Sequence, residues 1–278
     1  MPQSSLRQSV TRTTMRAYHT LRHQVRDSGL LPASADYTRF LCVGNPRTGS
    51  TLLMRSLNNH SRIIGYGEIV KDVDRYPGHY HEFGNGEAIF RRDPAAFLET
   101  RVFCKYPPDV EAVGFKIFYH HAPRDTAWGR AVWNYLLDQP DLKILHLKRR
   151  NLLKVFLSRK QAGRSGEYIK YSNGAKDTMA LDPDEAGIFF EQMRASEMEY
   201  DALLGGRPLF EVVYEEMTRD YGAVMRGIQS FLGVDYEDIN PGTEKRPSRS
   251  LSSQIENYTE LKAHFLGSPW ESFFSEQL

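Results

Sequence analysis

The segment from Arg39 to Leu57 constrains the fold more than any other part of the sequence. Arg39–Gly44 (R-F-L-C-V-G) is a short apolar run with aromatic and β-branched residues, which predicts a buried strand. Gly44–Thr51 (G-N-P-R-T-G-S-T) follows directly, and the next apolar residues fall on one side of a helix, at Leu52, Leu53, Met54 and Leu57. In a strand–loop–helix unit of this kind, backbone N–H groups and the helix N-terminus surround an anionic phosphate. The segment therefore predicts a phosphate-binding loop in an α/β domain.

Further strands and helices alternate along the rest of the chain. Strand-like apolar runs are expected at Ala112–Phe118, Lys143–Leu147 and Leu209–Tyr214. Helices are expected at Thr126–Leu137, Leu152–Gln161, Asp184–Leu204 and Glu215–Leu232. Strands that alternate with helices favour a parallel sheet covered on both faces. The predicted fold class is therefore α/β, a P-loop-like three-layer fold with a central parallel β-sheet flanked by helices.

The loop differs from a nucleotide-hydrolysing P-loop in the position of its positive charge. G-x-x-x-x-G is the spacing of a Walker loop, but Ser50 stands where that motif has Lys. The Walker Lys serves the β- and γ-phosphates, and the hydroxyl after it holds Mg²⁺. Here the cation is Arg47, so ATP or GTP hydrolysis is disfavoured, and a nucleotide with another phosphate layout and no need for a metal fits better. The alternative is a generic glycine-containing turn that caps a helix.

A second phosphate-suited site is predicted where the strand Lys143–Leu147 ends. The basic run Lys148–Asn151 (K-R-R-N) places Arg150 near the carboxyl end of this strand, where ligands bind in open α/β sheets. Ser158 lies two helical turns further on. Arginine recognises phosphate through two hydrogen bonds, and a serine hydroxyl adds another. The alternative is a solvated basic surface, but two such sites in one parallel sheet favour a shared ligand.

These two motifs resemble those of the sulfotransferase family that uses 3′-phosphoadenosine 5′-phosphosulfate (PAPS). Pro46–Leu53 (P-R-T-G-S-T-L-L) is similar to the family's 5′-phosphosulfate loop, and Arg150–Ser158 (R-x₇-S) is similar to its 3′-phosphate motif. The tail from Lys245 to Phe274 looks like the bacterial and carbohydrate-type branch. The chain departs from the family pattern in two ways. Arg47 stands where many members have Lys, and the R-K-G-x-x-G signature of the cytosolic small-molecule branch is absent from the sequence.

The resemblance implies residues for each part of the reaction. Arg47 would stabilise the charge that grows on the leaving 5′-phosphate. Glu68, in the run I-G-Y-G-E after the first helix, would take the proton of the acceptor hydroxyl. The implied donor-binding residues are Arg47, Thr48, Gly49, Ser50, Thr51, Arg150 and Ser158, with Lys245 and Arg246 closing over the 3′ end. No metal ligand is implied.

Other residues compete with Glu68 for the role of base. Glu68 itself has an alternative interpretation as a surface or helix-capping glutamate. The competing histidines are His120 and His121, which follow the strand that carries Lys116, and His79 and His81 in a loop-like segment. Lys116 either lines the donor pocket or buries its aliphatic stem at a strand edge.

Composition limits the remaining classes of protein. The 36 Lys and Arg residues nearly cancel the 35 Asp and Glu residues, and a net charge of +1 argues against a general nucleic-acid-binding surface. The two cysteines cannot form a disulfide framework, so we expect a reducing, cytoplasmic location. No apolar run approaches the ~20 residues needed to span a bilayer.

The chain is expected to divide into a basic N-terminal arm or helix, residues 1–36, and a sulfotransferase domain, residues 37–278. The Arg-rich, acid-poor start of the arm is also typical of organellar transit peptides, which is the alternative. Tyr76–Pro108 is rich in Gly, Pro, His and aromatic residues with little periodicity, so we expect a long insertion or lid with substrate contacts. Pro241–Ser253 is expected to be a basic loop.

The sequence thus predicts metal-independent transfer of a sulfuryl group from PAPS to a hydroxyl of a sugar, glycolipid or polyol, leaving adenosine 3′,5′-bisphosphate (PAP). The expected partner is a hydroxyl-bearing small-molecule or glycan acceptor, with no nucleic acid and no transmembrane segment. One alternative is a P-loop kinase-like phosphotransferase, which the missing Walker Lys disfavours. The other is a non-catalytic nucleotide-binding module.

Overall fold

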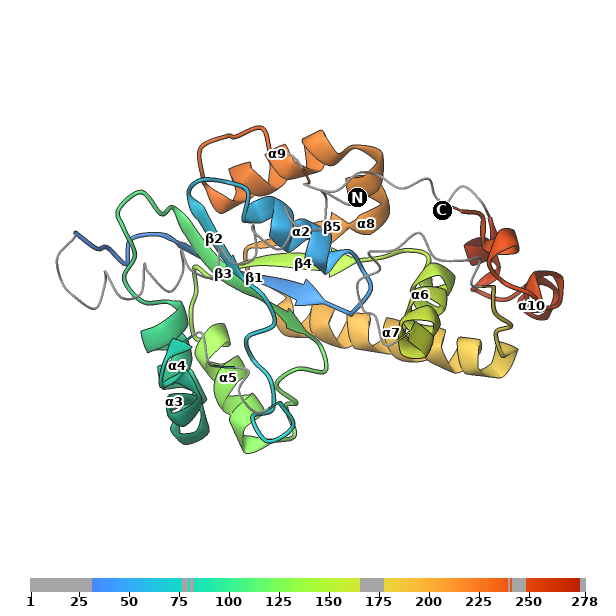
Figure 1. Ribbon diagram of the computed structural model, residues 1–278, viewed down its shortest axis with the longest axis horizontal. Coiled ribbons are helices and arrows are strands. Elements are labelled where there is room, and N and C mark those ends of the chain that lie inside the picture. Colours follow the sequence, from blue (N-terminus) through green and yellow to red (C-terminus); the bar gives the residue numbers. More distant parts are fainter. Residues whose placement is uncertain are drawn as a thin grey trace, which may run out of the picture.

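The computed structural model describes residues 32–76, 80, 83–165, 178–239, 241 and 249–275. At its centre is a five-stranded parallel sheet with the strand order β2-β3-β1-β4-β5 (Figure 1). The strands are β1 (Thr38–Gly44), β2 (Ile63–Tyr66), β3 (Ala112–Phe118), β4 (Lys143–Lys148) and β5 (Leu209–Val213). Helices cover both faces of this sheet, so the predicted three-layer α/β fold is confirmed.

The strands form where the sequence is continuously apolar. Every residue of β3 and the last five residues of β1 are buried. Strand β1 lies at the centre, where Phe40 pairs with Gly114 of β3 on one side and with Lys143 of β4 on the other. Parallel strands that are covered on both faces require such apolar runs. The four predicted strands are confirmed, and β2 is a fifth strand too short for periodicity to identify.

One face of the sheet is covered by α2 (Ser50–Leu57), α8 (Tyr214–Arg219) and α9 (Tyr221–Leu232). The apolar residues of α2 pack against Phe40 and Cys42 of β1. The single helix predicted over Glu215–Leu232 is wrong, because the chain leaves the helical conformation at Asp220 (φ −135°, ψ 76°). The Asp220 carboxylate accepts a hydrogen bond from the backbone N–H of Ala223 at 3.0 Å and so caps a new helix, α9.

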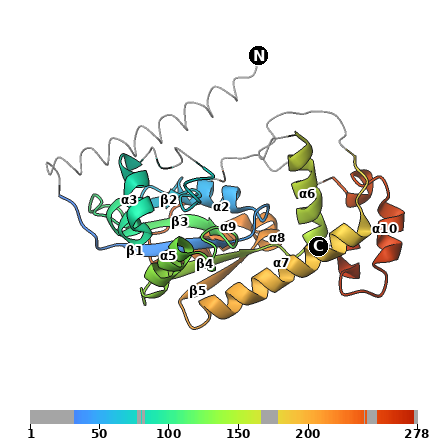
Figure 2. The same cartoon turned by 90° about the horizontal axis from the view of Figure 1, so that it is seen from below.

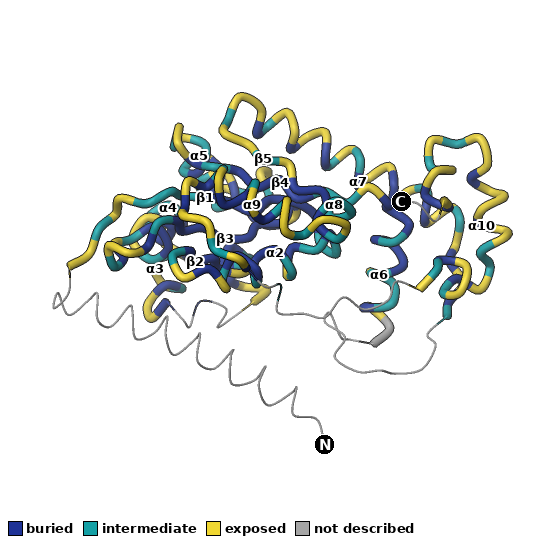
Figure 3. The backbone as a smooth tube through the Cα atoms, turned by 90° about the horizontal axis from the view of Figure 1, so that it is seen from above, coloured by how far each residue is buried: buried dark blue, intermediate teal, exposed yellow. Residues whose placement is uncertain are grey.

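The opposite face is covered by α3 (Gly86–Arg92), α4 (Pro94–Phe97), α5 (Ala127–Leu137) and α7 (Pro183–Leu204). Figure 2 shows α7 running as a long helix beneath the sheet. Its buried residues recur at helical spacing, at Ala186, Phe189, Phe190, Met193, Glu197, Tyr200 and Leu204. Figure 3 shows the exposed outer side of this helix against the buried strands. The helices predicted at Thr126–Leu137 and Asp184–Leu204 are confirmed.

The segment predicted to be a long insertion or lid contributes to the core. Helices α3 and α4 and a π-helical turn at Leu98–Val102 occupy about half of it. Phe90, Phe97 and Phe103 are each at most 2% exposed, and the Phe90 and Phe97 rings pack edge to face at 5.5 Å. The lid prediction is therefore wrong for these residues: their aromatic rings hold α3 and α4 against the sheet.

A third buried cluster surrounds α6 (Leu152–Ser165), the first turns of α7 and α10 (Tyr258–His264), which Figure 1 shows together at one end of the molecule. The predicted helix Leu152–Gln161 is confirmed as α6. Residues 1–31 of the predicted arm and most of the predicted loop Pro241–Ser253 lie outside the described residues. Among the described residues, no helix is long and apolar enough to cross a membrane.

Candidate active site

The loop after β1 leaves the first turn of α2 open to an anion. Gly49 is the N-cap of α2 and has no side chain that could occupy the N–H groups of the first turn. Arg47 and Gly49 both adopt left-handed backbone conformations, with φ of 68° and 95°. The Thr48 hydroxyl donates to the carbonyl oxygen of Asn45 at 2.6 Å, which links two residues of the loop. The result is a helix N-terminus and a tight loop of the kind that binds phosphate.

An aromatic ring from the end of β5 supports this loop. A Cβ atom on Gly49 would lie 2.4 Å from Cδ2 of Tyr214, so only glycine fits there without movement of the ring. The Arg149 guanidinium lies over the Tyr214 ring at 4.4 Å, and its Nη1 donates to the carbonyl oxygen of Arg47 at 3.0 Å. Tyr214 and Arg149 thus hold the strained backbone at Arg47 and Gly49 in place.

The side chain of Arg47 reaches the second predicted motif. Its Nε and Nη2 donate to Oγ of Ser158 at 3.0 and 2.8 Å. Ser158 lies on α6, far from Arg47 in the sequence, and the two are brought together because β4 lies beside β1 in the sheet. The two motifs that were predicted separately therefore meet at the carboxyl edge of the same sheet.

Arg150 lies at the turn between β4 and α6, and acidic residues of α8 hold it there. Its guanidinium pairs with the carboxylate of Glu216, and its backbone N–H donates to Oε2 of Glu215 at 3.0 Å. Asn151 donates its backbone N–H to the other Glu215 oxygen at 3.2 Å, and its own side-chain oxygen accepts from the N–H of Lys154 at 3.0 Å. This turn is therefore fixed at both ends before the helix begins.

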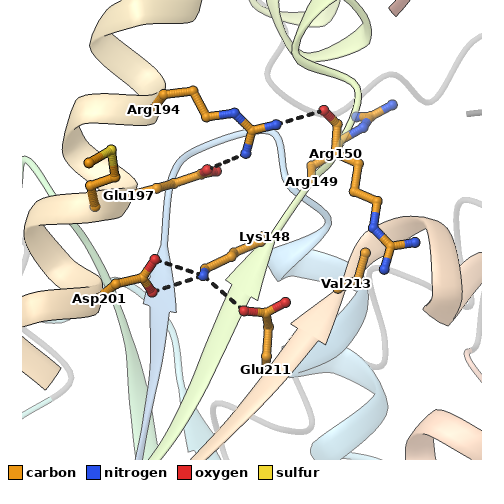
Figure 4. Close-up of a pocket in the computed structure, with 9 residues that line it drawn as sticks. Lys148, Arg149, Arg150, Arg194, Glu197, Asp201, Glu211 and Val213 are labelled. Carbon is orange, nitrogen blue, oxygen red and sulfur yellow. Dashed lines mark hydrogen bonds and ion pairs between the residues drawn. The ribbon is translucent and has the colours of Figure 1, made fainter. Parts of the chain in front are cut away.

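A cavity of about 290 Å³ lies on the α7 side of the same turn (Figure 4). Arg194 of α7 points across it, and its Nη2 lies 3.5 Å from the carbonyl oxygen of Arg150. Lys148 lies between Asp201 and Glu211, with its Nζ 2.8 Å from an oxygen of each. Carboxylates neutralise the cations that line this cavity. The lining side chains therefore hold the turn at Arg150 and do not form a second anion-binding site.

Glu68 lies beside the phosphate loop, connected to it by a lysine. Its Oε1 is 3.0 Å from Nζ of Lys116, and its Oε2 is 2.9 Å from Nζ of Lys71. The same Lys116 ammonium lies 3.4 Å from Oγ of Ser50, at the start of α2. Burial by itself raises the pKa of Glu68, but the two lysines outweigh it and lower that pKa to about 2.

Two of the histidines that compete for the role of base, His120 and His121, lie near this carboxylate. Nε2 of His121 is 3.9 Å from Oε2 of Glu68, while its Nδ1 accepts from the N–H of Phe118 at 3.3 Å. Burial, with a smaller contribution from His120, lowers the pKa of His121 to about 3. Burial also lowers the pKa of His120. Burial thus favours the neutral form of both rings.

Four predicted residues lie outside the described residues: His79, His81, Lys245 and Arg246. Three residues of the site were missed by the sequence reasoning: Lys71, Arg149 and Tyr214. The adjacent cations in Lys148–Asn151 were a signal for Arg149, but nothing local in the sequence pairs it with Tyr214. In the described part of the chain, no group of three or more His, Cys, Asp or Glu side chains is placed to hold a metal ion.

Known proteins match most of this chain. A model of the sulfotransferase family matches residues 40–238. Nodulation protein H of Rhizobium tropici is 26% identical to this chain over 84% of the chain and 92% of its own length. Nodulation protein H of Rhizobium meliloti strain 1021 is 24% identical, over 84% of this chain and 94% of its own.

Solved structures give similar matches. A sulfotransferase from Alicyclobacillus acidocaldarius aligns with a TM-score of 0.47 and 20% identity, over 85% of this chain and 95% of its own. A mouse sulfotransferase in complex with PAP aligns with a TM-score of 0.41 and 17% identity, over 75% of this chain and 61% of its own.

Proposed function

The chain belongs to the sulfotransferase family, and from this premise we propose that it transfers a sulfuryl group from PAPS to a hydroxyl of a sugar, glycolipid or polyol. The observation that carries the proposal is the contact between Arg47 and Ser158. It joins the phosphate loop to the second phosphate-suited motif, and so supports one ligand that carries a phosphate at each end. PAPS is such a ligand, whereas ATP carries its phosphates in one chain.

The 5′-phosphosulfate of the donor would bind in the loop after β1. The N–H groups of the first turn of α2 and the hydroxyls of Ser50 and Thr51 supply neutral donors there. Thr48 would contribute its backbone N–H, because its hydroxyl already donates to Asn45. The 3′-phosphate would bind Arg150 and Ser158, with Lys245 and Arg246 added from the later basic segment. Binding would exchange the Arg150–Glu216 ion pair, which is half-exposed, for a bidentate contact with phosphate.

The reaction is an in-line displacement at sulfur. The acceptor oxygen forms the new bond to sulfur, the bond between sulfur and the 5′-phosphate oxygen breaks, and PAP leaves with that electron pair. Arg47 would stabilise the charge on the leaving oxygen by electrostatics alone, because a guanidinium does not give up its proton at neutral pH. The contact with Ser158 keeps the guanidinium above the loop, ready to turn toward this oxygen.

Glu68 would take the proton of the acceptor hydroxyl once Lys116 also pairs with the bound PAPS. A carboxylate with a pKa of about 2 is a weak base at neutral pH. The Lys116 ammonium lies between Glu68 and Ser50, so a phosphosulfate in the loop competes for it. Withdrawal of Lys116 from Glu68 raises the pKa of that carboxyl. Donor binding would therefore strengthen the base at the moment that it is needed.

Turnover of the Arg47→Ala variant tests this assignment. With saturating PAPS, we expect turnover to fall by about 100-fold or more, the usual effect of removing one charge-stabilising group. Arg92→Ala, at an exposed arginine of α3, is the matched control and should keep full turnover. Unchanged turnover in Arg47→Ala would refute the role of Arg47.

Nucleotide binding separates the proposal from its alternatives. Calorimetry should detect PAP binding without Mg²⁺. A kinase-like phosphotransferase would instead bind ATP and require Mg²⁺. PAP binding without sulfuryl transfer to any member of a broad panel of hydroxyl acceptors would favour a non-catalytic module.

A further inference from the structure

We propose that a polar pocket beside the phosphate loop holds a single uncharged, hydroxyl-rich ring of the acceptor and selects it against charged rings. The inference rests on the proposed function, since it names the acceptor class for the same active site. The pocket has a volume of about 210 Å³ and is lined by Asn45, His120, Arg124, Ser196, Glu199 and Tyr200. Pockets for drug-sized ligands are typically about 300–1,000 Å³, so this one matches one sugar ring rather than a longer oligomer.

Residues that line the pocket adjoin both parts of the proposed reaction centre. Asn45 stands two residues before Arg47, at the start of the phosphate loop. On the other side, the His120 ring lies 4.5 Å from the ring of His121, whose Nε2 is 3.9 Å from Glu68. A ring bound here would therefore place one of its hydroxyl groups near the sulfate and the base.

Asn45 offers a hydrogen-bond donor that the fold does not use. The residue is 8% exposed, and among the described residues its Nδ2 has no hydrogen-bond partner. A buried polar group without a hydrogen-bond partner destabilises a fold, so such a group in a native protein suggests a ligand or a function. The loop uses the backbone carbonyl of Asn45, which accepts from Thr48. The side-chain amide, which lines the pocket, therefore keeps a donor for an acceptor oxygen.

The charges of the pocket favour an uncharged ligand. Arg124 lies 3.2 Å from Glu199, so the pair adds no net charge but places a donor and an acceptor side by side. A sugar hydroxyl both donates and accepts, and can bind the two groups at once. Glu199 would repel a carboxylate on the ring, and Arg124 would repel an ammonium group. Ser196 adds another group that donates and accepts.

The floor of the pocket is rigid. Tyr119 and Tyr200 stack with ring centroids 4.3 Å apart and an interplanar angle of 16°. The Tyr200 hydroxyl donates to the carbonyl oxygen of Tyr119 at 2.8 Å, and the Tyr119 hydroxyl lies 2.5 Å from Nε2 of the buried His146. Because these groups are already fixed, little ordering entropy opposes the binding of a small ring.

Three monosaccharides of different charge test the proposal: methyl glucoside, glucuronate and glucosamine. Their binding to the full chain, saturated with PAP, is measured by NMR titration. We expect methyl glucoside to bind most tightly. Asn45→Ala and Ser196→Ala should each weaken its binding about 3- to 10-fold, the effect of one lost hydrogen bond. Glu199→Gln should shift the preference toward glucuronate by a similar factor.

Two controls make the result decisive. Glu191→Gln, at an exposed glutamate of the same helix, should change nothing. Ser196→Ala should keep its affinity for PAP, since Ser196 lies on α7, outside the phosphate loop. Equal binding of the three sugars, no binding of methyl glucoside, or variants equal to the wild type would overturn the proposal. Loss of PAP binding by the wild type would instead refute the proposed function, whatever the sugars do.

Discussion

Replacing Glu68 with Gln should destabilise the fold at pH 7 and should do so much less at pH 3. The Glu68 carboxylate lies between the ammonium groups of Lys116 and Lys71, at 3.0 and 2.9 Å. The Lys116 side chain is only 8% exposed. Removal of the carboxylate charge leaves two largely buried cations close together without their shared partner, and uncompensated buried charge is strongly unfavourable.

The magnitude follows from the pKa of Glu68, which falls from an ordinary value of 4.5 to about 2 in the folded chain. At about 1.36 kcal/mol per pH unit, this difference corresponds to about 3 kcal/mol at neutral pH. The side chain is 28% exposed, and solvent screening reduces the expected loss to about 1–2 kcal/mol. Because the pKa is lowered by folding, the stabilisation is present above about pH 4.5 and is lost as the pH falls toward 2.

The assay is urea unfolding of the wild type and Glu68→Gln at several pH values from 7 to 3. The difference in free energy of unfolding should fall to less than half of its neutral value by pH 3, where Glu68 is already protonated in the unfolded chain. Glu191→Gln, at an exposed glutamate of α7, should match the wild type throughout. A difference that stays constant with pH, or a Gln variant more stable than the wild type, would contradict the electrostatic account of this cluster.

Two further substitutions test the packing around the site. Gly49→Ala should lose about 2–4 kcal/mol of stability, because the new methyl group meets Tyr214 and the backbone has φ of 95°. Gly84→Ala is the control for backbone strain alone, since its φ is 61° and nothing lies within 4 Å of a Cβ there; a thermal melt that shifts equally for both would exclude the clash. Asn151→Ala should lose about 1–3 kcal/mol, because its fully buried Nδ2 donates to the carbonyl oxygen of Phe273 at 2.9 Å. An unchanged urea midpoint would show that this link does not stabilise the fold.

The sequence alone was sufficient for four of the five strands and for the strand–loop–helix conformation that follows β1. Short stretches of sequence determine both features. Strands β1 and β3 are continuous apolar runs, and the loop needs Gly49 at a left-handed position directly before a helix. The spacing of Arg150 and Ser158 was equally visible. Residues close in the sequence carry these signals, because burial of a strand and the conformation of a turn depend on a few neighbouring side chains.

Local pattern also misled where several short elements share one segment. Tyr76–Pro108 showed little periodicity because α3 and α4 are each less than ten residues long and meet at Asp93 and Pro94. Its aromatic residues were interpreted as substrate contacts, but most of them are buried in the core against the sheet. Composition cannot distinguish an aromatic ring in a core from one in a binding site, since both gain from leaving water.

Only the tertiary structure decided which side chains meet at the carboxyl edge of the sheet. The order β2-β3-β1-β4-β5 places Ser158 against Arg47, and Lys116 between Glu68 and Ser50, although each of these contacts joins separate parts of the chain. The same order brings α7 beneath the loop and forms the pocket at Asn45. Such contacts depend on which strands become neighbours, and this is set by the packing of all the helices and strands together rather than by any one stretch of sequence.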